Sequence, residues 1–135
     1  MADPEVVEEW IRWADNDLAF ASACLEDKDR YIAQICFHLH QAVEKYLKAF
    51  IIANELEFEK IHDLVKLLKT CTTKKPVLTD LREACEFLNP FYIETRYPVS
   101  WPVHHTKEEA QQAKEFATSI GNTIKGHLGK QRGFR

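Results

Sequence analysis

Arg96 and the aromatic residues near it are the strongest candidates for chemistry in this sequence. The Arg96 guanidinium is a planar fork of five donors that suits a phosphate, and Tyr92, Tyr97 and Trp101 are close enough in sequence to offer stacking faces to a base. The alternative is that Arg96 pairs with Glu94 or caps a helix end, while the aromatic rings pack this segment onto the rest of the protein. The first interpretation predicts a ligand-binding site at this segment.

Histidine supplies the candidates for acid–base chemistry, because an ordinary pKa near ~6.5 lets imidazole give or take a proton at neutral pH. Of the six histidines, His104 is the best candidate. His38 and His40 are two residues apart and diverge by about 200° on a helix, so they cannot share a ligand. We interpret His62 and Asp63 as the start of a helix, where Asp63 favours the positive end of the dipole.

Two lysines in a predicted helix are further candidates for ligand contact. Glu44, Lys45 and Lys48 lie on or near the polar side of that helix, and Glu44 and Lys48 are spaced i,i+4. Such a pair stabilises an exposed helix by only ~0.3–0.5 kcal/mol. We interpret this side as a solvated face and keep Lys45 and Lys48 as candidate ligand contacts.

The segment that carries Arg96 and His104 spans residues 89–105 and shows no helical period. It contains three of the five prolines, and Pro98 and Pro102 forbid a regular helix through residues 97–103. We expect a structured loop that crosses between helices. Long loops in compact domains are often functional.

The helices that position this loop are organised around residues 30–54. Apolar residues recur there at helical spacing over an arc wider than one neighbouring helix can cover, which indicates the central helix of a bundle. The arc consists of Ile32, Ile35, Cys36, Leu39, Val43, Tyr46, Leu47, Phe50 and Ala53. A second, weaker apolar edge of Phe37, His40 and Ile51 lies outside it. This edge predicts a two-fold dimer that buries part of it.

Four further helices are predicted, over about 4–25, 62–71, 77–88 and from 106 onward. Asp3 should cap the first helix, and Thr106 with Glu109 should form a capping box at the start of the last. The buried stripe of the first helix should consist of Val6, Trp10, Ile11, Ala14, Leu18, Ala21 and Leu25. Three glycines from Gly126 onward predict a frayed tail. The basic residues near this end, Lys125, Lys130, Arg132 and Arg135, could touch RNA phosphates, although such a tail is more often a solubilising end.

Composition limits the class of partner. The chain has 135 residues, which is the size of one domain, and its formal net charge is −3. This charge argues against a surface built throughout for polyanions, so we expect no binding to double-stranded DNA, and any contact with RNA must be a local patch.

The four cysteines are scattered singly, without the close pairs of a zinc site, and are expected to be reduced thiols. The first residues lack the pattern of a signal peptide, and no apolar run approaches the ~20 residues of a membrane span. We therefore expect a cytoplasmic protein without membrane contact, metal or cofactor.

Four segments, taken in order, resemble the HEPN family (higher eukaryote and prokaryote nucleotide-binding domains). They read WIRWADNDLAFA in the first helix, HLHQAVEKYLKAFI in the second, HDLVKLL at the start of the third and ETRYPVSWP before the last. The chain is most similar to small prokaryotic members encoded beside a minimal nucleotidyltransferase. The resemblance implies one all-α domain over residues 1–135, a five-helix up-and-down bundle with a four-helix core and an additional short helix. It also implies a homodimer and a nucleotidyltransferase partner in a toxin–antitoxin-like pair.

The resemblance leaves two functions open. In the first, the dimer is a nucleotide-binding partner of the nucleotidyltransferase, with Arg96 and Tyr97 at the ligand end. In the second, it is a metal-independent endoribonuclease: the ribose 2′-hydroxyl attacks phosphorus, His104 assists proton transfer and Arg96 neutralises the developing charge. Catalytic members carry an arginine followed after four to six residues by histidine, whereas seven residues separate Arg96 from His104. This spacing favours the first function.

Overall fold

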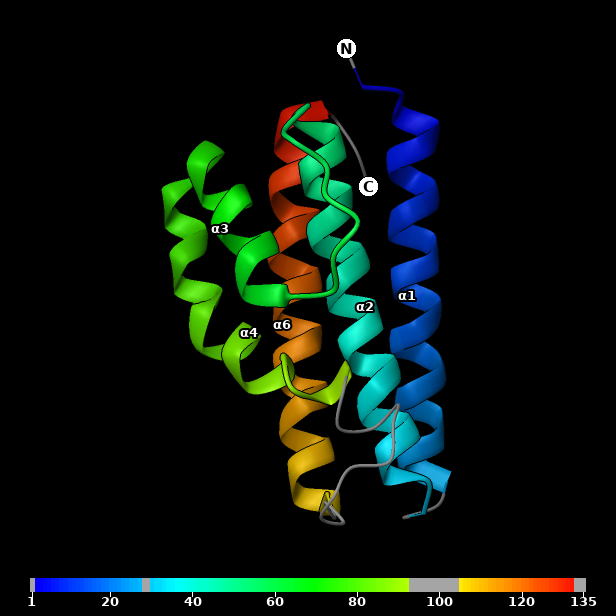
Figure 1. The fold of residues 1–135 in the computed structure, drawn as a ribbon. Helices are drawn as coiled ribbons and strands as arrows, with labels where there is room; N and C mark the ends of the chain where they lie inside the picture. The colour runs from blue at the N-terminus through cyan, green and yellow to red at the C-terminus, as the bar shows by residue number, and fades with distance from the viewer. Residues whose placement is uncertain (1, 28–29, 93–104, 133–135) are drawn as a thin grey trace.

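The computed structural model describes residues 2–27, 30–92 and 105–132, and these residues form helices without any strand. The three long helices lie side by side, with α1 running opposite to α2 and α6, while the shorter elements cover one side (Figure 1). The described elements are α1 (Pro4–Asp27), α2 (Ile32–Ala53), α3 (Leu64–Lys74), the 3-10 helix η1 (Pro76–Leu81), α4 (Arg82–Leu88) and α6 (Lys107–Arg132). The predicted all-α bundle is confirmed.

Helix α1 begins where its capping residue predicts. Oδ1 of Asp3 accepts a hydrogen bond from the Glu5 amide at 2.9 Å, and the Asp3 carbonyl accepts from the next two amides. One residue of the expected stripe is wrong: Val6 is 42% exposed, because Val7 takes the inner position and is buried. Trp10 and Leu18 are half-buried.

Helix α2 is the central helix, in contact with α1, α3 and α6. The dimer prediction required the second apolar edge of this helix to be exposed, but the structure shows that it is covered. His40 and Ile51 are fully buried within one chain, and the half-buried Phe37 packs near Tyr92, with ring centroids 5.9 Å apart. The structure therefore removes the reason for placing a dimer contact on this edge.

The bounds of the later helices differ from prediction in two places. The expected single helix over 77–88 is divided, because Pro76 starts a 3-10 turn before α4 begins. The expected fraying from residue 126 is also wrong within the described residues, because α6 continues to Arg132. Ile124 and Leu128 are fully buried and hold these last turns against the bundle. The capping box is confirmed, with the Thr106 amide 2.9 Å from Oε1 of Glu109 and the Glu109 amide 3.0 Å from Oγ1 of Thr106.

The cysteines are free thiols in the described structure. Cys36, Cys71 and Cys85 are buried, and burial raises the pKa of each thiol to about 12. Cys24 is half-buried. Within the described ranges, no helix has the length and apolar character to cross a membrane, and no group of side chains is arranged to hold a metal ion.

Candidate functional site

Three polar side chains on successive turns of α2 are buried in the described structure. His40 is fully buried, and Glu44 and Lys48 are each only 5% exposed. The interpretation of Glu44 and Lys48 as part of a solvated face is therefore wrong. The chain between α2 and α3 covers this face: His62 contacts Glu44, and the ring of Phe58 lies 5.6 Å from Nζ of Lys48.

Glu44 is the centre of this cluster. Its Oε2 accepts a hydrogen bond from Nζ of Lys48 at 2.8 Å, and Nδ1 of His62 lies 3.0 Å from Oε1 and 3.2 Å from Oε2. A buried charge needs a partner of opposite charge and further hydrogen bonds to offset the loss of water. Lys48 supplies the charge and His62 the second donor, so the carboxylate is satisfied.

His40 forms a hydrogen bond with the main chain of the segment between α2 and α3. Its Nε2 lies 3.0 Å from the carbonyl oxygen of His62. A carbonyl can only accept, so Nε2 of His40 carries the hydrogen. Burial lowers the pKa of His40, and the nearby Glu44 offsets this only in part. His40 is thus a neutral donor that fixes the backbone of His62 onto α2.

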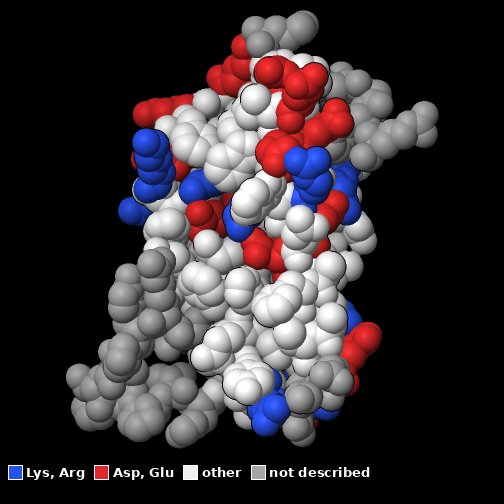
Figure 2. Space-filling model, turned by 90° about the vertical axis from the view of Figure 1, so that its right-hand side faces the viewer, with Lys and Arg blue, Asp and Glu red and all other residues white. Residues whose placement is uncertain are grey.

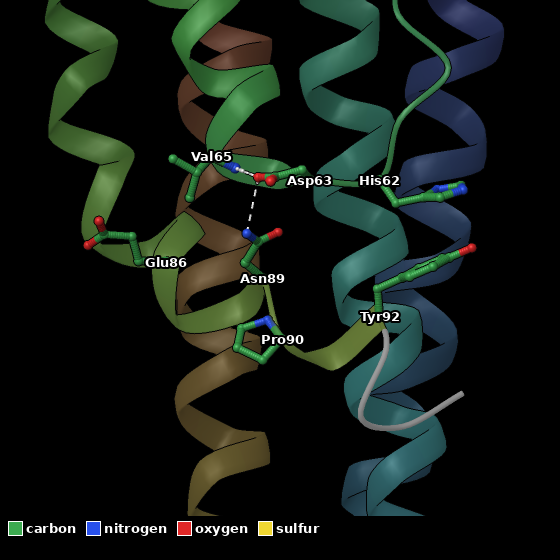
Figure 3. Close-up of a pocket in the computed structure, with 7 residues that line it drawn as sticks. All are labelled: His62, Asp63, Val65, Glu86, Asn89, Pro90 and Tyr92. Atoms are coloured by element: carbon green, nitrogen blue, oxygen red, sulfur yellow. Dashed lines mark hydrogen bonds between the residues drawn. The ribbon is translucent and has the colours of Figure 1, made fainter. Parts of the chain in front are cut away.

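The imidazole of His62 is fixed by contacts with Glu44 and Tyr92, yet much of it is exposed to solvent. It stacks on the ring of Tyr92, with centroids 4.1 Å apart and planes 13° from parallel (Figure 3). Its side chain is 46% exposed although Glu44 holds Nδ1. A carboxylate only accepts, so Nδ1 carries the hydrogen and the neutral ring has Nε2 as an acceptor.

His62 and Tyr92 form one part of a pocket between the start of α3 and the end of α4 (Figure 3). The lining residues are His62, Asp63, Val65, Glu86, Asn89, Pro90 and Tyr92. Oδ1 of Asp63 caps α3 by accepting from the amides of Val65 and Lys66 at 3.0 and 3.1 Å. Asn89 joins the two helices, because its Nδ2 donates to Oδ1 of Asp63 at 3.1 Å and its Oδ1 accepts from the Leu64 amide at 2.8 Å.

Tyr92 is the predicted site residue that the structure places at this pocket. Four others, Arg96, Tyr97, Trp101 and His104, lie outside the described residues. The residues beside that segment lie together, because the rings of Phe91 and His105 are in contact with centroids 4.9 Å apart. Helix α4 ends at Leu88 and a turn follows at residues 89 and 90, as expected, but residues 91 and 92 have helical backbone, which was not expected.

Lys45 and Lys48, the two lysines predicted to contact a ligand, each pair with a carboxylate and do not line the pocket of Tyr92. Lys48 is buried against Glu44. Lys45 pairs with Asp17 and lies 5.9 Å from the ring of Trp13, in a separate apolar hollow between α1 and α2. Both lysines therefore have structural partners within the chain.

His62 and Glu44 are the site residues that sequence reasoning did not find. The signal was the spacing of four that places His40, Glu44 and Lys48 on one face of α2. Polar residues at that spacing predict a solvated stripe unless another segment covers them. Only the tertiary structure shows that the residues before α3 do so.

Comparisons with known proteins agree on one family. The model of the HEPN domain family matches residues 7–127. A protein of Methanocaldococcus jannaschii named "Putative toxin MJ1304" is 26% identical over 139 residues, which cover 93% of this chain and 90% of that protein.

Two crystal structures have the same fold. TT1696 from Thermus thermophilus is 30% identical, with a TM-score of 0.78 over 89% of this chain and 96% of that one. ST0689, described as an archaeal HEPN homologue, is 28% identical, with a TM-score of 0.73 over 90% of this chain and 97% of that one.

Proposed function

Since this chain belongs to the HEPN domain family, we propose that it is a dimeric nucleotide-binding protein that works with a minimal nucleotidyltransferase in a toxin–antitoxin-like pair. The similarity to a relative named as a toxin supports the toxin-like setting. The nucleotidyltransferase partner follows from the resemblance of the four sequence segments. Co-expression with a neighbouring nucleotidyltransferase reading frame tests this part, because a true partner should copurify with the chain.

The observation that carries the binding proposal is the stack of His62 on Tyr92 at the edge of a pocket. Tyr92 comes four residues before Arg96 in the sequence. In the proposal, Arg96 binds a phosphate as a bidentate donor, and Tyr97 and Trp101 add stacking faces. Titration with ATP tests this binding, and the variant that decides it is Arg96→Ala.

The outer face of α1 supports self-association. Val6, Trp13 and Phe20 follow one another at intervals of seven and are 42%, 57% and 54% exposed. Figure 2 shows that most charged side chains on this face lie in its upper half, which leaves a broad uncharged area below them, above a few charged groups at the lower end. A stripe with a period of seven suits contact with a second helix, so we place the dimer contact on α1. Sedimentation of the wild type and of Phe20→Ser tests it, because the variant should shift toward monomer.

The second candidate function is a metal-independent endoribonuclease that uses Arg96 and His104 across the dimer. The similarity to the relative named "Putative toxin MJ1304" supports the nuclease as a second candidate. Incubation with total RNA in the absence of divalent metal separates the two functions. Cleavage by the wild type that is lost in both Arg96→Ala and His104→Ala would establish the nuclease. Intact RNA, with ATP binding retained, would establish the binding protein.

A further inference from the structure

His62 is fixed by three separate contacts. His40 donates to its carbonyl oxygen at 3.0 Å, Glu44 accepts from its Nδ1 at 3.0 Å, and Tyr92 stacks on its ring at 4.1 Å. Two of these partners are buried residues of α2, the most enclosed helix of the bundle. An imidazole held in this way has one orientation, although nearly half of its side chain is exposed.

The contact with Glu44 also fixes which ring nitrogen is available. Because the carboxylate takes the hydrogen of Nδ1, Nε2 is the acceptor of the neutral ring. Within residues 2–27, 30–92 and 105–132, no hydrogen bond to Nε2 of His62 is formed. The same arrangement of carboxylate, imidazole and open nitrogen is used where proteins orient a histidine toward a ligand.

The charges around the pocket limit what this nitrogen can contact. Asp63 and Glu86 line the same pocket as His62. Two carboxylates disfavour a phosphate, even though Arg82 pairs with Glu86 at 3.0 Å, whereas they tolerate or favour a neutral group that carries N–H or O–H donors. Val65 and Pro90 add apolar surface to the lining. A base amino group or a ribose hydroxyl meets these conditions.

We propose that Nε2 of His62 accepts a hydrogen bond from the nucleoside part of a ligand that occupies the pocket between α3 and α4. The inference deepens the proposed function, because it assumes that the ligand is a nucleotide and assigns the neutral end of that nucleotide to His62. The phosphate end is left to Arg96. Glu44 is then a positioning residue that orients His62 without touching the ligand.

The test uses adenosine as the neutral probe and inorganic tripolyphosphate as the anionic probe. In the wild-type protein, ¹⁵N resonances of His62 should show hydrogen on Nδ1 and none on Nε2 in the free state at a pH where the ring is neutral. Adenosine should then shift the Nε2 resonance, and tripolyphosphate should leave it in place. A His62 ring with hydrogen on Nε2, or an Nε2 resonance that adenosine does not move, would overturn the inference without any variant.

The matched variants are His62→Asn and His38→Asn. An asparagine amide can still donate to Glu44 from the position of Nδ1, but it lacks Nε2, so adenosine affinity should fall by roughly three- to tenfold. His38 is the control, because it is also part-exposed and its Nδ1 lies 3.2 Å from a carboxylate oxygen of Asp17. His38→Asn should bind adenosine like the wild type. Equal adenosine affinity in His62→Asn and the wild type would overturn the inference.

The failure of this inference differs from the failure of the proposed function. If ATP and tripolyphosphate bind in an Arg96-dependent way but His62→Asn does not change adenosine affinity, the proposed function is supported and the role of His62 is refuted. If adenosine binding depends on His62 but Arg96→Ala leaves ATP affinity unchanged, the role of His62 stands and the proposed phosphate contact falls. If neither probe nor ATP binds, both fall.

Discussion

Nδ1 of His62 lies 3.0 Å from Oε1 of Glu44, although His62 precedes α3 and Glu44 lies in the middle of α2. This contact ties the chain between the two helices to the central helix, and it leaves Nε2 as the acceptor of the neutral imidazole. The carboxylate can do this because Lys48 neutralises it from the next turn at 2.8 Å. The pocket edge therefore depends on a buried ion pair.

Glu44→Gln should destabilise the protein by about 3–5 kcal/mol, because it leaves the charge of Lys48 buried without a partner. Urea unfolding followed by circular dichroism measures the change. The matched control is Glu86→Gln, which breaks an exposed pair with Arg82 and should cost less than about 1 kcal/mol. The double variant Glu44→Gln/Lys48→Met should recover part of the loss. Equal stability of Glu44→Gln and Glu86→Gln would show that the pair is not buried.

Two glycines of α6 should respond in opposite directions to alanine. A Cβ at Gly121 would lie 2.7 Å from Cζ of the buried Tyr46 ring, whereas a Cβ at Gly126 would meet nothing within 4 Å. Gly121→Ala should therefore lower the free energy of unfolding by about 1–3 kcal/mol. Gly126→Ala should raise it by about 0.5–1 kcal/mol, because alanine favours helix. Thermal unfolding of both variants measures these two changes in the free energy of unfolding. A destabilised Gly126→Ala would show that α6 ends earlier.

The stability of the fold should fall in mild acid because of His40. Burial lowers its pKa from the ordinary value of 6.5, and the nearby Glu44, Gln41 and the carbonyl of His62 oppose this shift only in part. The unfolded chain then binds a proton more readily than the folded chain. The contribution of His40 is therefore complete above pH 6.5 and is lost as the pH falls toward the folded-state pKa, at up to about 1.4 kcal/mol per pH unit.

Urea midpoints at about pH 7.5 and about pH 5.5 measure this loss. In His40→Gln the amide can still donate to the His62 carbonyl but does not titrate, so the difference between the two pH values should shrink. His38→Gln keeps the buried histidine and should retain the wild-type difference. A full acid loss in His40→Gln would assign the effect to other groups.

The four thiols should divide into one that reacts in the folded protein and three that do not. Burial raises the pKa of Cys36, Cys71 and Cys85 to about 12, so at neutral pH they carry almost no thiolate and are also shielded from reagent. Cys24 is only half-buried. Ellman's reagent should titrate one thiol natively and four in urea, and Cys24→Ser should abolish the native reaction. A fast second thiol would contradict the burial of the core cysteines.

Much of the fold could be predicted because its signals are local. Asp3 and the pair Thr106 and Glu109 mark helix starts through side chains that bond to amides two or three residues away. The wide apolar arc of α2 also required a central position, whatever its neighbours. Pro76 indicated a break, but not that a 3-10 turn would follow it.

The candidate site could be predicted only in part, because its contacts are long-range. Tyr92 is predicted from its aromatic ring, and it lines the pocket in the structure. Glu44 and Lys48 are assigned to a solvated face, and His40 to an apolar edge of a dimer, because a helical period shows which residues share a face, not what covers that face. Their coverage depends on His62, eighteen residues beyond Glu44, and no local pattern reports such a contact.

We propose that this HEPN chain binds a nucleotide phosphate through Arg96, and titration calorimetry with ATP tests this claim most directly. Charge-assisted hydrogen bonds contribute ~1.5–3 kcal/mol each, so Arg96→Ala should weaken ATP binding roughly ten- to a hundredfold. Arg96→Lys keeps the charge without the fork and should be nearly as damaging.

The matched control is Arg12→Ala, which removes an arginine that is exposed on α1 and pairs with Glu9. We expect wild-type ATP affinity for Arg12→Ala and the roughly ten- to hundredfold loss for Arg96→Ala, with circular dichroism unchanged in both. ATP affinity in Arg96→Ala equal to that of the wild type would contradict the claim.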